Sequence, residues 1–155
     1  ARLGYTKLET AELVDALNKL LANYSVHYQK LRNFHWNVKG GEFFELHEQF
    51  EIQYQSAQKA IDEIAERVRI FGQRPLSTLK QFIDHSDIME ELEELPSSAM
   101  TLEILKDYRV LIEKLFNVVD IAIEHGDSGT EDLAKTYIKQ LEKNHWMLTA
   151  FSQTN

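Results

Sequence analysis

Residues 33–51 read NFHWNVKGGEFFELHEQFE. Apolar side chains recur every three or four positions on both sides of Gly40-Gly41, which is the period of an amphipathic α-helix. Two adjacent glycines between such segments indicate a turn, so this stretch is predicted to be the tip of a helical hairpin. In a hairpin that turns at these glycines, His35 comes to lie beside His47.

The same period extends outward into four long segments. The first opens with Thr6-Lys-Leu-Glu9, a capping box in which a hydroxyl and a glutamate satisfy free backbone N–H groups. Gly72 and Pro75 end the second segment, and Gly126 ends the third. The helices predicted in this way span approximately residues 6–36, 42–71, 105–125 and 130–151.

The connection between the second and third helices is long. Within it, STLKQFID (77–84) is predicted to form a short helix, and the acidic run at 90–94 is expected to be a solvated linker. Short first and third connections around a long middle one predict two antiparallel hairpins joined by a crossover. The expected fold is all-α: a single domain over residues 1–155, a ferritin-like four-helix bundle with a short extra helix in the long crossover between helices two and three.

The composition of the chain limits the metal ligands and the binding partners that it can have. The chain of 155 residues has no cysteine, so any metal site must use histidine and carboxylate ligands. Its net charge of -8 disfavours a nucleic-acid partner held by a basic surface. No apolar run approaches the roughly 20 residues of a membrane span, and no signal-peptide pattern is seen, so a cytoplasmic protein without a membrane partner is expected.

One polar stripe follows the second helix beside its apolar face. Its members, spaced by four, four, three, four and four positions, are His47, Glu51, Gln55, Gln58, Asp62 and Glu66. At about 1.5 Å of rise per residue, His47 and Asp62 lie roughly 22 Å apart and cannot bind one metal within a chain. Because the spacing is palindromic, two copies crossing antiparallel about its centre bring the two ends together. Glu51 then faces Asp62, and His47 faces Glu66.

With His35 beside His47, each such dimer has two sites built from imidazoles of one chain and carboxylates of the other. Imidazole and carboxylate without sulfur suit Fe(II), Mn(II) or Zn(II), and several acids able to bridge favour one or two iron ions. Trp36 places an oxidisable ring next to His35. The alternative is equally open at this point: amphipathic helices always carry polar residues at this spacing, and the stripe is then a solvated surface.

NFHWNVKGGEFFELHEQFE, followed by IDEIAER (61–67), resembles the signature of the Dps family, the DNA-binding proteins from starved cells, or mini-ferritins. The crossover helix and EKNHWML (142–148) also fit this family. The resemblance implies a homododecameric shell that is a ferroxidase. Such a shell oxidises Fe(II) with hydrogen peroxide or O2, stores ferric (Fe3+) mineral and protects against oxidative damage.

The ligands that the resemblance implies lie at a two-fold interface, with Trp36 as the neighbouring aromatic. They are His35, His47, Asp62 and Glu66. Relatives usually have aspartate where this chain has Glu51, whose longer arm is expected to reach the metal as well.

The resemblance further implies acidic three-fold pores through which iron enters. Asp132 matches such a pore best, and Asp127 and Glu124 are weaker matches. DNA binding is not expected, because the first residues, ARLGYTK, contain only Arg2 and Lys7 as cations. Two alternatives are a DNA-compacting or structural shell protein without significant ferroxidase activity, and a plain helical bundle without metal.

The other histidines are predicted to serve packing or the surface. Glu142 and His145 form a Glu-x-x-His motif, but a metal site inside the bundle needs a second copy of it, so packing of His145 is favoured. His27 is expected to be packed or interfacial, and His85 exposed. His125, at a helix C-terminus, is explained by the helix macrodipole.

Overall fold

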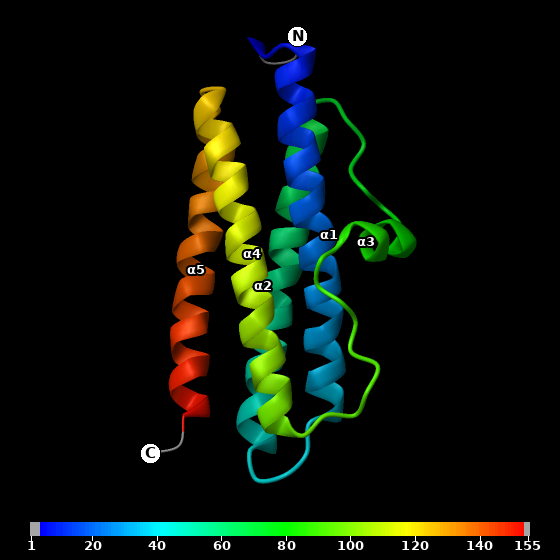
Figure 1. Cartoon of the computed structure of the whole chain (residues 1–155), viewed down its shortest axis with the longest axis vertical. Helices are drawn as coiled ribbons and strands as arrows, with labels where there is room; N and C mark the ends of the chain where they lie inside the picture. Colours follow the sequence, from blue (N-terminus) through cyan, green and yellow to red (C-terminus); the bar gives the residue numbers. More distant parts are fainter. Residues whose placement is uncertain (1–3, 154–155) are drawn as a thin grey trace.

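Five helices make up the part of the chain that the computed structural model describes, residues 4–153 (Figure 1). They are α1 (Lys7–Asn37), α2 (Phe43–Ile70), α3 (Leu79–His85), α4 (Ser97–Glu124) and α5 (Ser128–Ser152). None of them is long and apolar enough to cross a membrane. Arg2, on which part of the DNA prediction rests, lies outside the described residues.

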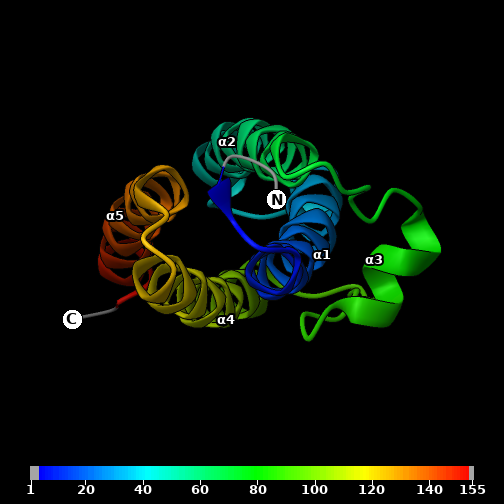
Figure 2. The same cartoon turned by 90° about the horizontal axis from the view of Figure 1, so that it is seen from above.

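The four long helices form two antiparallel hairpins. α1 packs against α2 and α4, and α4 packs against α5. The crossover carries α3, which lies against the outer side of α1 (Figure 2). The predicted all-α, ferritin-like bundle with a short helix in its crossover is therefore confirmed.

Helix ends follow from local chemistry. The predicted capping box is present: the Thr6 hydroxyl accepts from the Glu9 N–H (3.2 Å), and the Glu9 carboxylate accepts from the Thr6 N–H (2.8 Å). Gly40 turns the first hairpin with φ of 99°, a conformation that side chains disfavour. The third long helix starts at Ser97, earlier than predicted, because Pro96 is extended and has no N–H that needs a helical partner.

Two other helices, α3 and α5, begin at different residues than predicted, because their N-cap residues were not recognised in the sequence. α5 begins at Ser128 rather than Thr130, since the Asp127 carboxylate accepts from the Thr130 N–H (3.1 Å) and is the N-cap. α3 is displaced toward the C-terminus because Thr78 and Gln81 form a second capping box.

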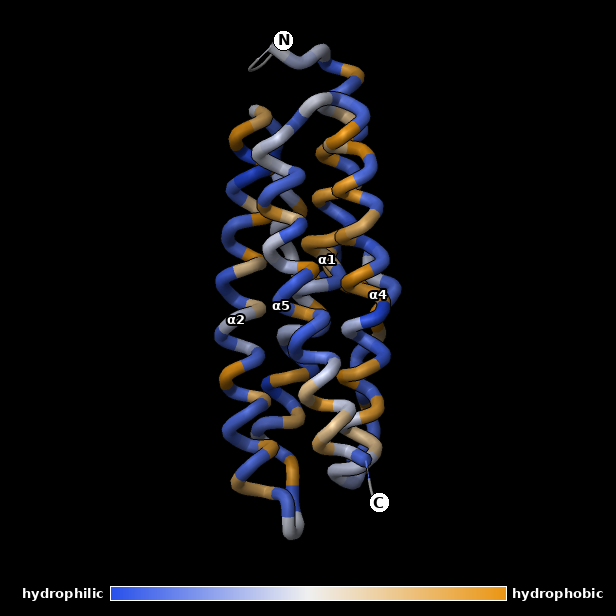
Figure 3. The backbone as a smooth tube through the Cα atoms, turned by 90° about the vertical axis from the view of Figure 1, so that its left-hand side faces the viewer, coloured by the Kyte–Doolittle hydropathy of each residue, from blue (hydrophilic) through white to orange (hydrophobic). Residues whose placement is uncertain are grey.

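The core runs the length of the bundle, and apolar positions recur along each helix with a helical repeat (Figure 3). Phe34 of α1 meets Phe50 of α2, with ring centroids 5.9 Å apart. Burial of each large apolar side chain contributes about 1.5–3 kcal/mol. The predicted α2 seam is buried at Phe50, Ala57, Ile64, Val68 and Phe71 and half-buried at Tyr54 and Ile61.

One charged cluster lies inside this core. Asp107 of α4 accepts from Lys30 (2.9 Å) and lies 3.1 Å from the Nδ1 atom of His27. All three side chains are buried. The packed histidine predicted at His27 is confirmed, and its partner carboxylate explains why it is tolerated there.

Candidate metal centre

His35 and His47 lie face to face where α1 ends and α2 begins. Their ring centroids are 3.9 Å apart and the planes are 11° from parallel. Each histidine is bonded to the other's backbone: His35 Nδ1 lies 2.6 Å from the His47 carbonyl oxygen, and His47 Nδ1 lies 2.7 Å from that of His35. The predicted juxtaposition of these histidines across the hairpin is therefore confirmed.

These reciprocal hydrogen bonds select the tautomer. A carbonyl oxygen only accepts, so each Nδ1 carries the hydrogen and donates it. In the neutral ring, Nε2 then keeps the lone pair that binds a metal, and a second-shell hydrogen bond of this kind orients such a ligand. The backbone of the hairpin thus leaves the Nε2 atoms of both imidazoles able to bind a metal.

Two aromatic rings restrict these imidazoles further. Phe43 stacks on His47 with centroids 4.8 Å apart, and the Tyr54 ring meets His35 edge-on at 5.4 Å. Neither aromatic is among the predicted site residues. Their helical spacing is the signal that points to them, since Phe43 precedes His47 by one turn of α2. Both imidazoles are therefore held by aromatic contacts as well as by hydrogen bonds.

Glu51 is the carboxylate nearest to the histidine pair among the predicted ligands of this chain. Its Oε1 atom lies 3.7 Å from His35 Nε2, and its side chain is 44% exposed. Its other oxygen accepts from Gln55 (3.4 Å). The Glu51 carboxylate therefore lies near the Nε2 atom of His35, and the Glu51 side chain remains open to solvent.

Asp62 and Glu66 lie farther along the same unbroken helix. Asp62 follows His47 by fifteen positions, which corresponds to roughly 22 Å, so one chain does not bring them together. Both carboxylates are exposed. Neither forms a hydrogen bond or ion pair with any residue from 4 to 153. One chain thus presents a histidine half and an acidic half, separated along α2.

Trp36 is the predicted aromatic neighbour of the site. Its side chain is 57% exposed, and the Arg32 guanidinium lies 5.0 Å from its ring centroid. This cation–π contact holds the indole on the outer surface of α1, next to His35 in sequence.

The three predicted pore carboxylates differ in surroundings. Asp127 is 1% exposed, and its Oδ1 atom accepts from Arg67 (2.9 Å) as well as from the α5 backbone. Asp132 is exposed, and its carboxylate has no hydrogen-bonding or ionic partner within residues 4–153. Glu124 lies at the end of α4, near Glu12. Asp132 and Glu124 thus have carboxylates without a partner in the described part of the chain, whereas that of Asp127 is engaged.

Comparison with known proteins agrees with this architecture. A family model described as a ferritin-like domain matches residues 14–154. The chain is 41% identical over 140 residues to "DNA protection during starvation protein 2" of Bacillus anthracis, covering 90% of this chain and 96% of that protein. The protein of Brevibacillus brevis named "DNA protection during starvation protein" is 40% identical over 135 residues, covering 87% and 91%.

A solved structure is similar over almost its whole length. The Vibrio cholerae Dps protein superposes with a TM-score of 0.95 at 35% identity, covering 99% of this chain and 96% of that one. Its description places it in a broad superfamily of ferritin-like diiron-carboxylate proteins.

Proposed function

The chain belongs to the Dps family of ferritin-like proteins, and we propose that it is a ferroxidase. It oxidises Fe(II) with hydrogen peroxide at sites between subunits and stores the ferric product inside a dodecameric shell. The single observation that carries this proposal is the locked pair of His35 and His47, whose free Nε2 atoms lack sufficient carboxylate ligands in their own chain.

A second copy supplies the missing carboxylates. The stripe on α2 is palindromic, so an isologous two-fold contact brings Asp62 and Glu66 of one subunit to the histidine pair of the other. Ile52, which lies beside the stripe, is 46% exposed, as expected of an apolar residue that a partner covers. The description of the Vibrio cholerae relative as a diiron-carboxylate type of protein supports iron as the substrate.

The chemistry balances with peroxide as the oxidant. Two Fe(II) ions each lose one electron, the O–O bond of one hydrogen peroxide breaks, and its oxygens leave as two waters after taking up two protons. Carboxylates of both subunits stabilise the rising positive charge on the iron ions. Because the electrons are consumed in pairs, no hydroxyl radical is released, and iron storage is accompanied by protection against oxidation.

The test is peroxide-driven Fe(II) oxidation by His47→Ala and Asp62→Ala. Each variant is expected to lose on the order of tenfold or more in rate, since each removes a ligand. Light scattering on each variant separates the loss of a ligand from the loss of the assembly, and an assembled oligomer is expected in both. His85→Ala, which removes an exposed histidine on α3, is the matched control. Unchanged rates in both site variants would refute the assignment.

A second candidate function follows from the names of the relatives, two of which refer to DNA protection. DNA compaction by this chain would need a cationic surface, and its net charge is -8. We therefore propose protection through iron and peroxide removal. A gel-shift assay at physiological salt is expected to show no retention of DNA, and retention would favour the second candidate.

A further inference from the structure

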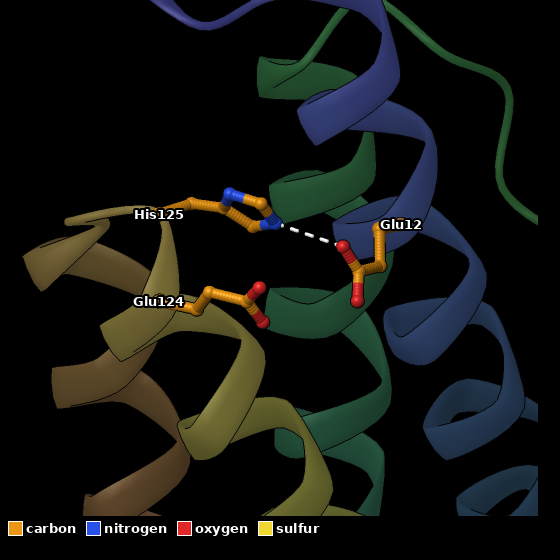
Figure 4. Close-up of side chains that lie close together, drawn as sticks. All are labelled: Glu12, Glu124 and His125. Atoms are coloured by element: carbon orange, nitrogen blue, oxygen red, sulfur yellow. Dashed lines mark hydrogen bonds and ion pairs between the residues drawn. The ribbon is translucent and has the colours of Figure 1, made fainter.

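A second group of metal-ligand residues lies at the opposite end of the bundle from the histidine pair. Glu12 near the start of α1 meets Glu124 and His125 at the end of α4 (Figure 4). Each offers one ligand atom, and these atoms all lie within 4.8 Å of one another. The shortest contact joins His125 Nε2 to Glu12 at 2.9 Å. A single chain thus assembles imidazole and carboxylate ligands from two helices.

The charge around this group is unbalanced. Glu9 adds a third carboxylate, 3.9 Å from His125 Nδ1. Within residues 4–153, no lysine or arginine forms an ion pair with Glu9, Glu12 or Glu124. The C-terminal carbonyl groups of α4 add further negative potential at His125. The group therefore attracts a cation, and His125 supplies one only when it is protonated.

Geometry decides which cation fits. Ligands at about 2.0–2.2 Å from a shared ion lie roughly 3–4 Å from one another, a spread that the present separations approach. His125 is anchored, with only 13% of its side chain exposed, whereas the Glu12 side chain is 48% exposed and free to adjust. Nitrogen with carboxylate oxygen suits a divalent transition metal better than magnesium or calcium, which prefer oxygen alone.

We propose that Glu12, Glu124 and His125 bind a divalent transition-metal ion, with Zn2+ as the representative, within each single chain. Bound there, the ion joins the start of α1 to the end of α4, whose ligands are 113 positions apart in sequence. Because the unfolded chain does not hold these ligands together, the ion also stabilises the fold. This site is independent of the inter-subunit site and of its proposed activity.

The experiment uses the full chain with His47→Ala and Asp62→Ala in the background, which removes a ligand from each half of the inter-subunit site. Zn2+ is titrated by calorimetry, and crystals soaked in Zn2+ are measured at the zinc absorption edge. We expect one ion per chain and an anomalous peak between Glu12 and His125.

Glu124→Gln is the decisive variant. The Glu124 carboxylate makes no hydrogen bond or ion pair with residues 4–153, so the substitution removes a ligand without breaking a side-chain contact of the fold. It should weaken Zn2+ binding about tenfold or more, and His125→Ala should abolish the anomalous peak. His85→Ala should leave both unchanged.

Two results would overturn the proposal. One is the absence of an anomalous peak at this group in the parent protein. The other is equal Zn2+ affinity in the parent, Glu124→Gln and His125→Ala, with circular dichroism showing all three folded. Because the background lacks one ligand from each half of the inter-subunit site and the anomalous peak is sought between Glu12 and His125, neither result depends on whether the chain is a ferroxidase.

Discussion

The two ends of the bundle use histidine in different ways. Where α1 meets α2, two imidazoles are locked by each other's backbone, but their acidic partners lie far along α2. Where α1 meets α4, a single imidazole at His125 is already surrounded by carboxylates of its own chain. The first end presents two imidazoles with Glu51 nearby, and the second presents one imidazole among the carboxylates of Glu9, Glu12 and Glu124.

The two ends therefore differ in whether metal binding is expected within one chain or only between two assembled chains. Hydrogen bonds orient both imidazoles of the histidine pair, so part of the ordering that usually weakens binding has already taken place during folding. In the proposed ferroxidase site, this pair nevertheless depends on a partner chain for Asp62 and Glu66. The group at His125 depends only on the packing of α1 against α4, so its metal affinity should not vary with oligomeric state.

The largest effect that tests this comparison is expected from mixing two inactive variants. His47→Ala and Asp62→Ala chains are denatured together, refolded in equal amounts and assayed for Fe(II) oxidation by peroxide. In a mixed dimer, one site contains both substitutions, while the other contains neither. If half of the dimers are mixed, about a quarter of the sites are intact and about a quarter of the wild-type rate returns.

Sites contained within one chain would give a different result. No combination of the two chains would then restore a site, and the mixture would stay as inactive as each variant. The same refolding of the double variant His47→Ala, Asp62→Ala with wild type controls for the yield of assembly.

Much of the architecture could be predicted from the sequence, because it depends on local signals. Helical period and glycine positions predict the four long helices, and the turn at Gly40 predicts that His35 meets His47. The starts of α3 and α5 were predicted less well, because their N-cap residues were not recognised. Asp127 was interpreted as a pore carboxylate, yet an aspartate three positions before Thr130 is also an N-cap signal that sets the start of α5.

Contacts between distant segments could not be predicted in the same way. His125 was attributed to the helix macrodipole, and nothing in the spacing links it to Glu12, because their contact depends on how α1 packs on α4. The same holds for Asp107, which pairs with His27 across 80 positions.

A smaller effect is expected from Asp127, which shares the His125 end of the bundle but is structural. Asp127→Ala removes the α5 cap and the ion pair with Arg67, so the free energy of unfolding should fall by about 1–3 kcal/mol. Asp127→Asn should lose less, because asparagine also caps helices. Asp132→Ala should change it by no more than about 0.5 kcal/mol. Guanidinium denaturation at one protein concentration measures all three, and equal losses would contradict the capping role.

The smallest effect concerns the proton on His125 in metal-free protein. The hydrogen bond to Glu12, aided by the charges of Glu12, Glu124 and Glu9, raises the pKa of His125 above its ordinary value, although partial desolvation opposes this. A raised pKa favours the protonated folded form. The resulting stability is therefore fully present below the unfolded pKa of about 6.5 and is lost as pH rises through the higher folded value.

Hydrogen–deuterium exchange at the histidine C2 position, followed by mass spectrometry, measures this pKa in the assembled protein. Glu12→Gln should lower it toward the ordinary value, since the charged partner of the hydrogen bond is lost. An unchanged His125 pKa in Glu12→Gln would mean that Glu12 does not act on His125, and the hydrogen bond between them would then not explain the raised pKa.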